Sequence, residues 1–95
     1  MEQDKVEREL AVALSNTYEV PTSVTCRGVE FTLSGLRITV AFTPHTGMRC
    51  WCICILDRQL PFVVMSATVP IDKNDLDFNV TNVIGSFLES WGVTW

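Results

Sequence analysis

Alternating segments on either side of Ser34-Gly35 constrain the fold more than any other feature of the sequence. Apolar residues occupy every second position before and after this dipeptide: Val29, Phe31, Leu33, Leu36, Ile38 and Val40. Alternation with a period of two is typical of a strand with one buried side, and a two-residue loop with glycine is typical of a β-hairpin. If Leu33 pairs with Leu36, all six apolar side chains fall on one side. The sequence therefore predicts an antiparallel hairpin with a core side.

A third strand is predicted over residues 48–56 and a fourth over residues 61–69, because apolar residues alternate in both. A four-residue turn before the third strand would pair Val40 with Trp51. Trp51 and the isoleucines two and four positions later then join the core side. The cysteines between them face the opposite side of the predicted sheet: Cys50, Cys52 and Cys54.

Amphipathic helices are predicted at both ends of the chain, over residues 2–17 and 75–91, from apolar residues at helical spacing. Gly92 suits the position just after the second helix. Before the hairpin, Val24 is out of phase with the first alternating segment, so Arg27-Gly28 marks a bulge or a tight turn. The order predicts a single α+β domain over residues 1–95: an N-terminal helix, a four-stranded, meander-like antiparallel sheet, and a C-terminal helix packed on the sheet.

Composition excludes several classes of protein. Hydrophobic residues make up 47% of the chain and charged residues 19%, which excludes a disordered chain. The longest unbroken apolar run, Cys50 to Leu56, is too short to cross a bilayer, and the polar start does not resemble a secretory signal. Seven basic residues oppose eleven acidic ones without forming a cluster. Neither nucleic acid nor a membrane is therefore expected as a partner.

The three cysteines of the third strand bear on the cellular compartment. Side chains two residues apart on a strand point the same way, with Cα atoms roughly 6.6–6.8 Å apart, whereas a disulfide needs Cβ atoms at about 3.8 Å. Neighbouring cysteines of this row therefore cannot bond to each other within a strand. Three adjacent thiols favour a reducing compartment, so a cytoplasmic location is expected.

The cysteine side of the predicted sheet poses the functional question. Two helices suffice to cover the core side, and the other side of such a sheet is usually polar. Instead, the last two strands place apolar residues beside the cysteines, either Phe62 and Val64 or Val63 and Met65, depending on register. An apolar surface of this kind usually marks a contact. Either one helix crosses over to cover it, or it meets another chain, most simply a copy related by a two-fold axis.

The leading hypothesis is a non-catalytic protein-binding module, such as an inhibitor, an immunity factor or a chaperone-like adaptor. It would act as a homodimer through the apolar sheet face and bind a further, unidentified protein, with no cofactor. The expected interface residues are these: Cys50, Cys52, Cys54, Phe62, Val64 and Ala41. Trp95 is a possible partner anchor, because tryptophan is enriched at binding hot spots. In its element order and acidity the chain resembles the small acidic α+β secretion chaperones, which implies protein binding.

The alternative hypothesis is a thiol-based metal-binding or redox protein that uses the cysteine row. Cys50 and Cys52 could converge on one Zn²⁺, with His45 reaching the same ion from the preceding turn. Cys54 would lie about 13 Å from Cys50 along the strand and could not join them. His45 is the sole histidine, so any Cys–His or Ser–His catalytic pair would need it. No other catalytic or phosphate-binding motif occurs in the sequence, and no enzymatic activity is expected.

Overall fold

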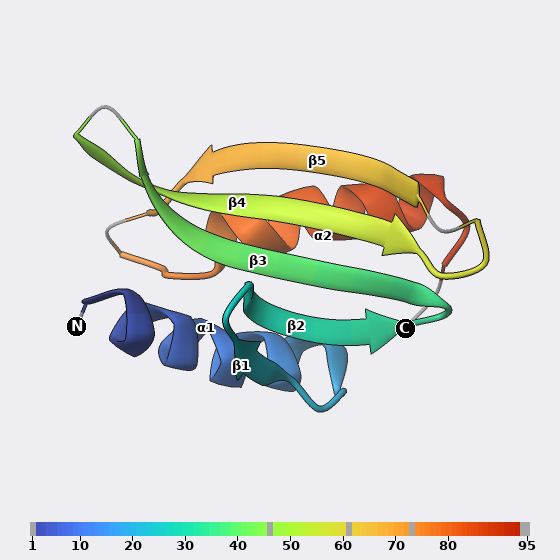
Figure 1. Cartoon of the computed structure of the whole chain (residues 1–95), viewed down its shortest axis with the longest axis horizontal. Coiled ribbons are helices and arrows are strands. Elements are labelled where there is room, and N and C mark those ends of the chain that lie inside the picture. Colours follow the sequence, from blue (N-terminus) through green and yellow to red (C-terminus); the bar gives the residue numbers. More distant parts are fainter. Residues whose placement is uncertain (1, 46, 61, 73, 94–95) are drawn as a thin grey trace.

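The elements of the chain, taken from a computed structural model that describes residues 2–45, 47–60, 62–72 and 74–93, follow one another in a simple order. They are α1 (Glu2–Tyr18), β1 (Ser23–Thr25), β2 (Gly28–Leu33), β3 (Leu36–His45), β4 (Met48–Asp57), β5 (Phe62–Pro70) and α2 (Phe78–Ser90). The strands form one antiparallel sheet in the order β1-β2-β3-β4-β5, so each strand pairs with its neighbours in the chain (Figure 1). The α+β class, both helices and the meander are confirmed. The prediction of four strands is wrong, because the sheet has five.

The extra strand, β1, arises from a tight turn at the position where the sequence pattern changes phase. Thr25 pairs with Gly28 across the intervening residues, and the Thr25 hydroxyl accepts a hydrogen bond from the N–H of Arg27 at 3.1 Å. Gly28 has a φ of 118°, a backbone conformation that only glycine adopts readily. A strand of three residues is too short to show an alternating pattern, which is why the sequence did not reveal it.

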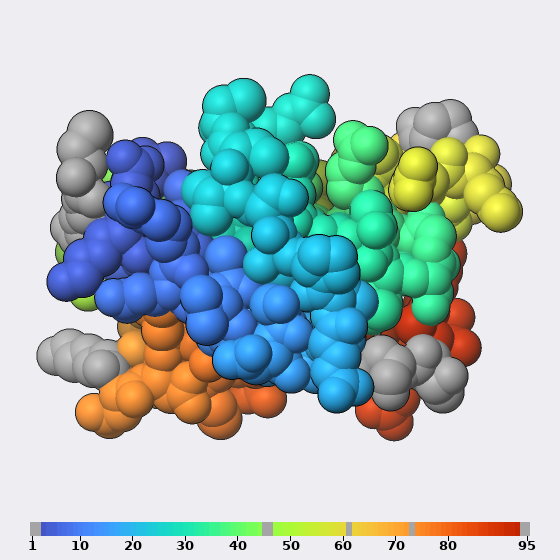
Figure 2. Space-filling model, turned by 90° about the horizontal axis from the view of Figure 1, so that it is seen from below, coloured from blue at the N-terminus to red at the C-terminus, as the bar shows by residue number. Residues whose placement is uncertain are grey.

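The core lies between one side of the sheet and the two helices. Figure 1 shows both helices behind the sheet, and Figure 2, seen from below, has the strands on the upper side, α1 on the near side and α2 on the lower side. The sheet contributes these buried side chains: Val29, Phe31, Leu36, Ile38, Val40, Trp51, Ile53 and Ile55. The helices contribute these: Val6, Leu10, Ala11, Leu14, Val80, Ile84 and Leu88. The core side predicted from the alternating pattern is confirmed.

The ladder between β3 and β4 is shifted by two residues from the predicted one. β3 continues to His45, which pairs with Met48, so Val40 lies opposite Ile53 rather than Trp51. The hairpin is therefore longer, and its turn shorter, than predicted. Because side chains alternate with a period of two, a shift of two leaves every side chain on its predicted side.

A buried carboxylate connects α1 to the sheet. Glu7 is 2% exposed, and its Oε2 accepts a hydrogen bond from the backbone N–H of Phe42 at 3.1 Å. The pairing of β3 with β2 reaches only Val40, at the start of β2, and Phe42 lies beyond it. The helix thus supplies the acceptor that the neighbouring strand no longer provides for this N–H.

The helix α2 begins three residues later than predicted because carboxylates hold the preceding loop. Asp72 Oδ1 accepts hydrogen bonds from the N–H groups of Asn74 and Asp75, at 2.7 and 3.2 Å. Such side-chain turns compete with the first turn of a helix. At the other end, Gly92 has the positive φ, 81°, that the sequence predicted after the helix. Neither helix, within the described residues, is long and apolar enough to span a membrane.

Tyr18, at the end of α1, is buried against β2 and has a perturbed pKa. Its ring stacks on Phe31 with 5.5 Å between centroids. Burial, and to a smaller extent the negative charge of Asp77, raises the pKa of Tyr18 from 10.0 to about 12. The folded state therefore holds this proton more tightly than the unfolded chain. Its contribution to stability is complete below pH 10 and is lost as the pH rises towards 12.

We expect the native protein to form tyrosinate only near pH 12, and the denatured chain to form it near pH 10. Tyr18 is the single tyrosine, so the ultraviolet absorbance of tyrosinate reports this group alone. The measurement is a spectrophotometric pH titration with and without denaturant, with circular dichroism recorded at each pH to follow the fold. Tyr18→Phe is the control, because it removes the signal and flattens the alkaline decline in stability. A native transition near pH 10, with the circular dichroism unchanged, would contradict the burial of this hydroxyl.

Candidate functional site

The side of the sheet opposite the helices, which we call the outer face, faces the viewer in Figure 1. Neither helix lies over it, because both pack on the other side of the sheet. The ladders bring together one row of Ala41, Cys52 and Thr68, and a second row of Thr39, Cys54 and Ser66. All six side chains are short and uncharged. The centre of the outer face is therefore uncharged, but it is not the apolar surface that the sequence predicted, because three of the six side chains carry hydroxyl groups.

The three cysteines of β4 differ in how much surface they offer. Cys52 and Cys54 are half-buried although no helix covers them, since their strand has neighbours on both sides. Cys50 lies between Thr43 and Pro70 and is only 5% exposed. All four cysteines are free thiols, including Cys26 in the turn after β1. The accessible part of the row is thus Cys52 and Cys54, with Ala41 beside them.

The expected placement of Phe62 and Val64 beside the cysteines is wrong. The ladder of β4 and β5 has an irregularity between Ile55 and Leu56, which makes Leu56 pair with Val63. Neither of the two registers left open by the sequence holds in full, because Val63 lies on the side of the cysteines as in the second one, whereas Val64 and Met65 both pack against the core. A bulge inserts one extra residue and so changes the phase of the strand beyond it.

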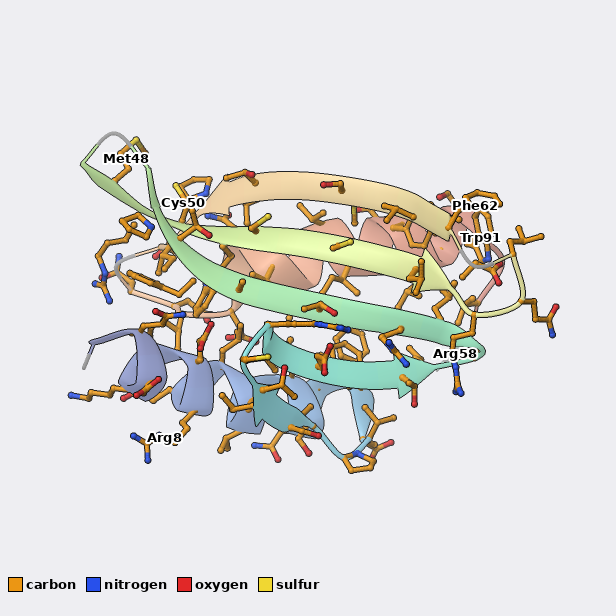
Figure 3. The ribbon with its side chains drawn as sticks, in the orientation of Figure 1. Arg8, Met48, Cys50, Arg58, Phe62 and Trp91 are labelled. Atoms are coloured by element: carbon orange, nitrogen blue, oxygen red, sulfur yellow. The ribbon has the colours of Figure 1, made fainter. Side chains whose placement is uncertain are left out.

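Phe62 belongs instead to an exposed patch at one end of the molecule. Figure 3 shows Phe62 and Trp91 at the end where β5 begins and α2 stops. Phe62 is 53% exposed and Trp91 45%, and the Trp91 ring stacks on Phe87 at 5.3 Å. Trp95, the expected partner anchor, lies outside the described residues.

The charged groups of the outer face lie at its β2–β3 margin. Glu30 pairs with Thr39, and Arg37 with Thr32, so the two charges are diagonal neighbours. The Oε1 atom of Glu30 is buried and has no hydrogen-bond partner among the described residues. A buried carboxylate oxygen without a donor is unfavourable, so a donor from outside this chain would stabilise it.

The metal hypothesis gains no support from the part of the chain that the structure describes. In it, no group of three or more histidine, cysteine or acidic side chains is placed to hold a metal ion. Cys50 and Cys52 are neighbours in the cysteine row as predicted. The side chain of His45 is not among the groups that the structure describes. Zinc needs four ligands in a structural site and three protein ligands in a catalytic one, which two thiols do not supply.

A groove that the sequence did not predict lies at the opposite end from Phe62, where the β3–β4 hairpin approaches the start of α1. Its volume is about 850 Å³, and it is lined by both basic and acidic side chains, among them Lys5, Arg49, Glu9 and Asp72. No cysteine lines it. The mixed charge of this lining gives no preference for an anion or a cation.

Comparisons of the chain with protein-family models, with curated proteins and with solved structures found no match.

Proposed function

We propose that the protein is a non-catalytic protein-binding module that acts as a homodimer and uses the outer face of its sheet as a contact surface. The observation that carries the proposal is the bare outer face, because both helices lie on the other side of the sheet. The alternative that a helix crosses over to cover the cysteines is thereby removed for the described residues. An antiparallel sheet can leave one face in water, so what favours a contact here is the uncharged centre of the outer face together with the unsatisfied oxygen of Glu30 at its margin.

The chemistry of the outer face favours a protein over a charged polymer as its partner. Its centre holds alanine, threonine, serine and cysteine side chains, which suit a flat, neutral protein surface. The chain has a net charge of −4, so a nucleic acid would be repelled rather than attracted. The unsatisfied oxygen of Glu30 adds a specific requirement, since the partner surface would best bring a donor such as an arginine to this margin.

The test introduces a charge at the centre of the outer face with Cys52→Glu. A carboxylate there must be desolvated in any complex, so we expect at least a tenfold loss of binding, either to a second copy or to a partner protein that copurifies from the source cells. The fold should survive, because the side chain of Cys52 points away from the core. Light scattering measures the mass of the recombinant protein, and copurification with mass spectrometry measures the retention of a partner.

Val12→Glu is the matched control for this experiment. Val12 is 63% exposed on α1, so the substitution adds the same charge at a site away from the sheet. We expect this variant to keep the mass and the partner of the native protein. If Cys52→Glu folds and leaves both unchanged as well, the outer face is not a contact surface and the proposal fails.

A further inference from the structure

The outermost strand β5 is an unprotected edge of the sheet. It has nine residues and pairs only with β4 among the described strands, and Figure 1 shows no element beyond it. From Leu60 to Ile71 the sequence contains no charged residue. Soluble proteins usually blunt such an edge with charges, proline or a covering segment, since its free backbone groups can pair with another strand. In β5 the protecting features lie near the two ends of the strand, namely the bulge at Val64 and the proline at position 70. The middle of the strand has none.

The ladder determines which backbone groups of β5 point away from the sheet. Ile71 donates its N–H to the carbonyl of Arg49 at 2.9 Å. Ile71 and Arg49 are therefore a hydrogen-bonded pair of the ladder, and the backbone groups of Ile71 point towards β4. Hydrogen-bonded and non-hydrogen-bonded pairs alternate along an antiparallel ladder. The N–H and C=O groups of Val69 and Ala67 therefore also point towards β4. The N–H and C=O groups of Thr68 and Ser66 therefore point outward.

The outward edge ends at Pro70. Proline has no N–H, and the carbonyl of Pro70 accepts a hydrogen bond from the Asn79 side chain of α2 at 2.7 Å. At the other end the bulge at Val64 interrupts the regular geometry. The groups free to bond to a further strand are thus concentrated at Ser66 and Thr68, close to the middle of the strand.

We propose that a second copy of this chain pairs with β5 in antiparallel orientation, with Ala67 on the two-fold axis. In this register Ser66 of each copy lies opposite Thr68 of the other. The N–H and C=O groups of both residues then form hydrogen bonds across the axis. The two copies of Ala67 form a pair without hydrogen bonds, the type in which Cα atoms approach most closely, about 4.5 Å, and a small side chain suits it.

The side chains match in the same register. On the helix side, Met65 of each copy meets Val69 of the other, and both are half-buried apolar residues packed at the edge of the core. On the outer face, the hydroxyls of Ser66 and Thr68 meet, a pair that can hydrogen-bond across strands. No like charges are brought together, because β5 carries none.

The match of Met65 with Val69 and of Ser66 with Thr68 across the axis favours a second copy as the occupant, and the unequal edges of the sheet limit the assembly to two chains. The other edge, β1, has only three residues, a length that protects it from pairing. Pairing through β5 therefore uses one edge of each copy and closes at two chains. This inference rests on the homodimer in the proposed function and assigns the contact between the copies to β5, which leaves the outer face for the partner protein.

Hydrogen exchange of the unmodified protein tests the pairing residue by residue. The amides of Ser66 and Thr68 should exchange at least tenfold more slowly in concentrated solution than after dilution below the dissociation constant of the dimer. The amides of Ala67 and Val69, which bond to β4, should be protected at both concentrations. Fast exchange of Ser66 and Thr68 in a sample that light scattering shows to be dimeric would overturn the assignment.

Ser66→Pro removes the outward donor without removing a hydrogen bond to β4, and proline is tolerated at such edge positions. Two of the four symmetric hydrogen bonds are lost, so the dissociation constant should rise about thirtyfold. Ser66→Ala keeps the N–H and is the control, expected to remain dimeric. Circular dichroism of both variants verifies the fold.

The outcomes separate this inference from the proposed function. A dimer that persists in folded Ser66→Pro but dissociates in Cys52→Glu overturns the edge pairing and supports contact through the outer face. A dimer that dissociates only in Ser66→Pro supports the edge. A native protein that stays monomeric at every concentration overturns the pairing and the homodimer, while the binding of another protein is still decided by Cys52→Glu.

Discussion

Gly28→Ala is expected to destabilise the protein by about 3–5 kcal/mol, combining backbone strain with overpacking. A Cβ atom at this position would lie 2.5 Å from the carbonyl oxygen of Val40 and 2.8 Å from the Cα of Ala41. Both are backbone atoms of β3, which cannot rotate away. The φ of 118° is also unfavourable for alanine. The loss is large against a total stability of roughly 5–14 kcal/mol for a chain of this size.

Gly35→Ala is the matched control for Gly28→Ala. Gly35 also has a positive φ, 81°, but a Cβ there would meet nothing within 4 Å. Its expected loss is therefore the conformational strain alone, about 1–2 kcal/mol. Urea denaturation of both variants gives the free energies of unfolding. Equal losses in the two variants would show that β2 and β3 are not as close at Gly28 as the structure has them.

Trp51→Ala is expected to destabilise the protein by about 3–5 kcal/mol, because it leaves a large cavity in the core. Trp51 is fully buried, and its Nε1 donates a hydrogen bond to the carbonyl of Leu76 at 3.0 Å. The substitution removes both the packing of the ring and this link to the segment before α2. Thermal and urea denaturation measure the loss.

Two variants separate the parts of the effect at Trp51. Trp51→Phe keeps much of the ring volume but loses the N–H donor, so it should be destabilised less than Trp51→Ala. Trp91→Ala removes an equally large side chain that is 45% exposed, and we expect a loss of about 1 kcal/mol or less. A Trp51→Ala protein as stable as Trp91→Ala would contradict a core centred on Trp51.

The sequence predicted which side chains lie on each side of β2, β3 and β4, because alternation fixes the side even when the register is uncertain. The shift of two residues between Val40 and its partner illustrates this, since it moved no side chain to the other side. The strand β1 was missed because three residues carry no periodic signal. The late start of α2 depends on hydrogen bonds of Asp72 that residue spacing does not reveal.

The candidate site was predictable only in part. The position of Cys52 and Cys54 opposite the core follows from alternation alone. The placement of Val63 and Val64 depends on a bulge, and a run of similar apolar residues contains no sign of where one extra residue is inserted. The buried oxygen of Glu30 and the outward amides of β5 likewise depend on geometry across strands, which one strand's sequence does not encode.

The meander has a consequence for the order in which the fold can assemble. Every strand pairs with its neighbours in the chain, so the sheet can form stepwise from local pairings. The helix α2 supplies Val80, Ile84 and Leu88 to the core. Until α2 packs, part of the apolar side of the sheet is open to water. We therefore expect the chain to aggregate most readily in a state in which the sheet has formed and α2 has not yet packed against it.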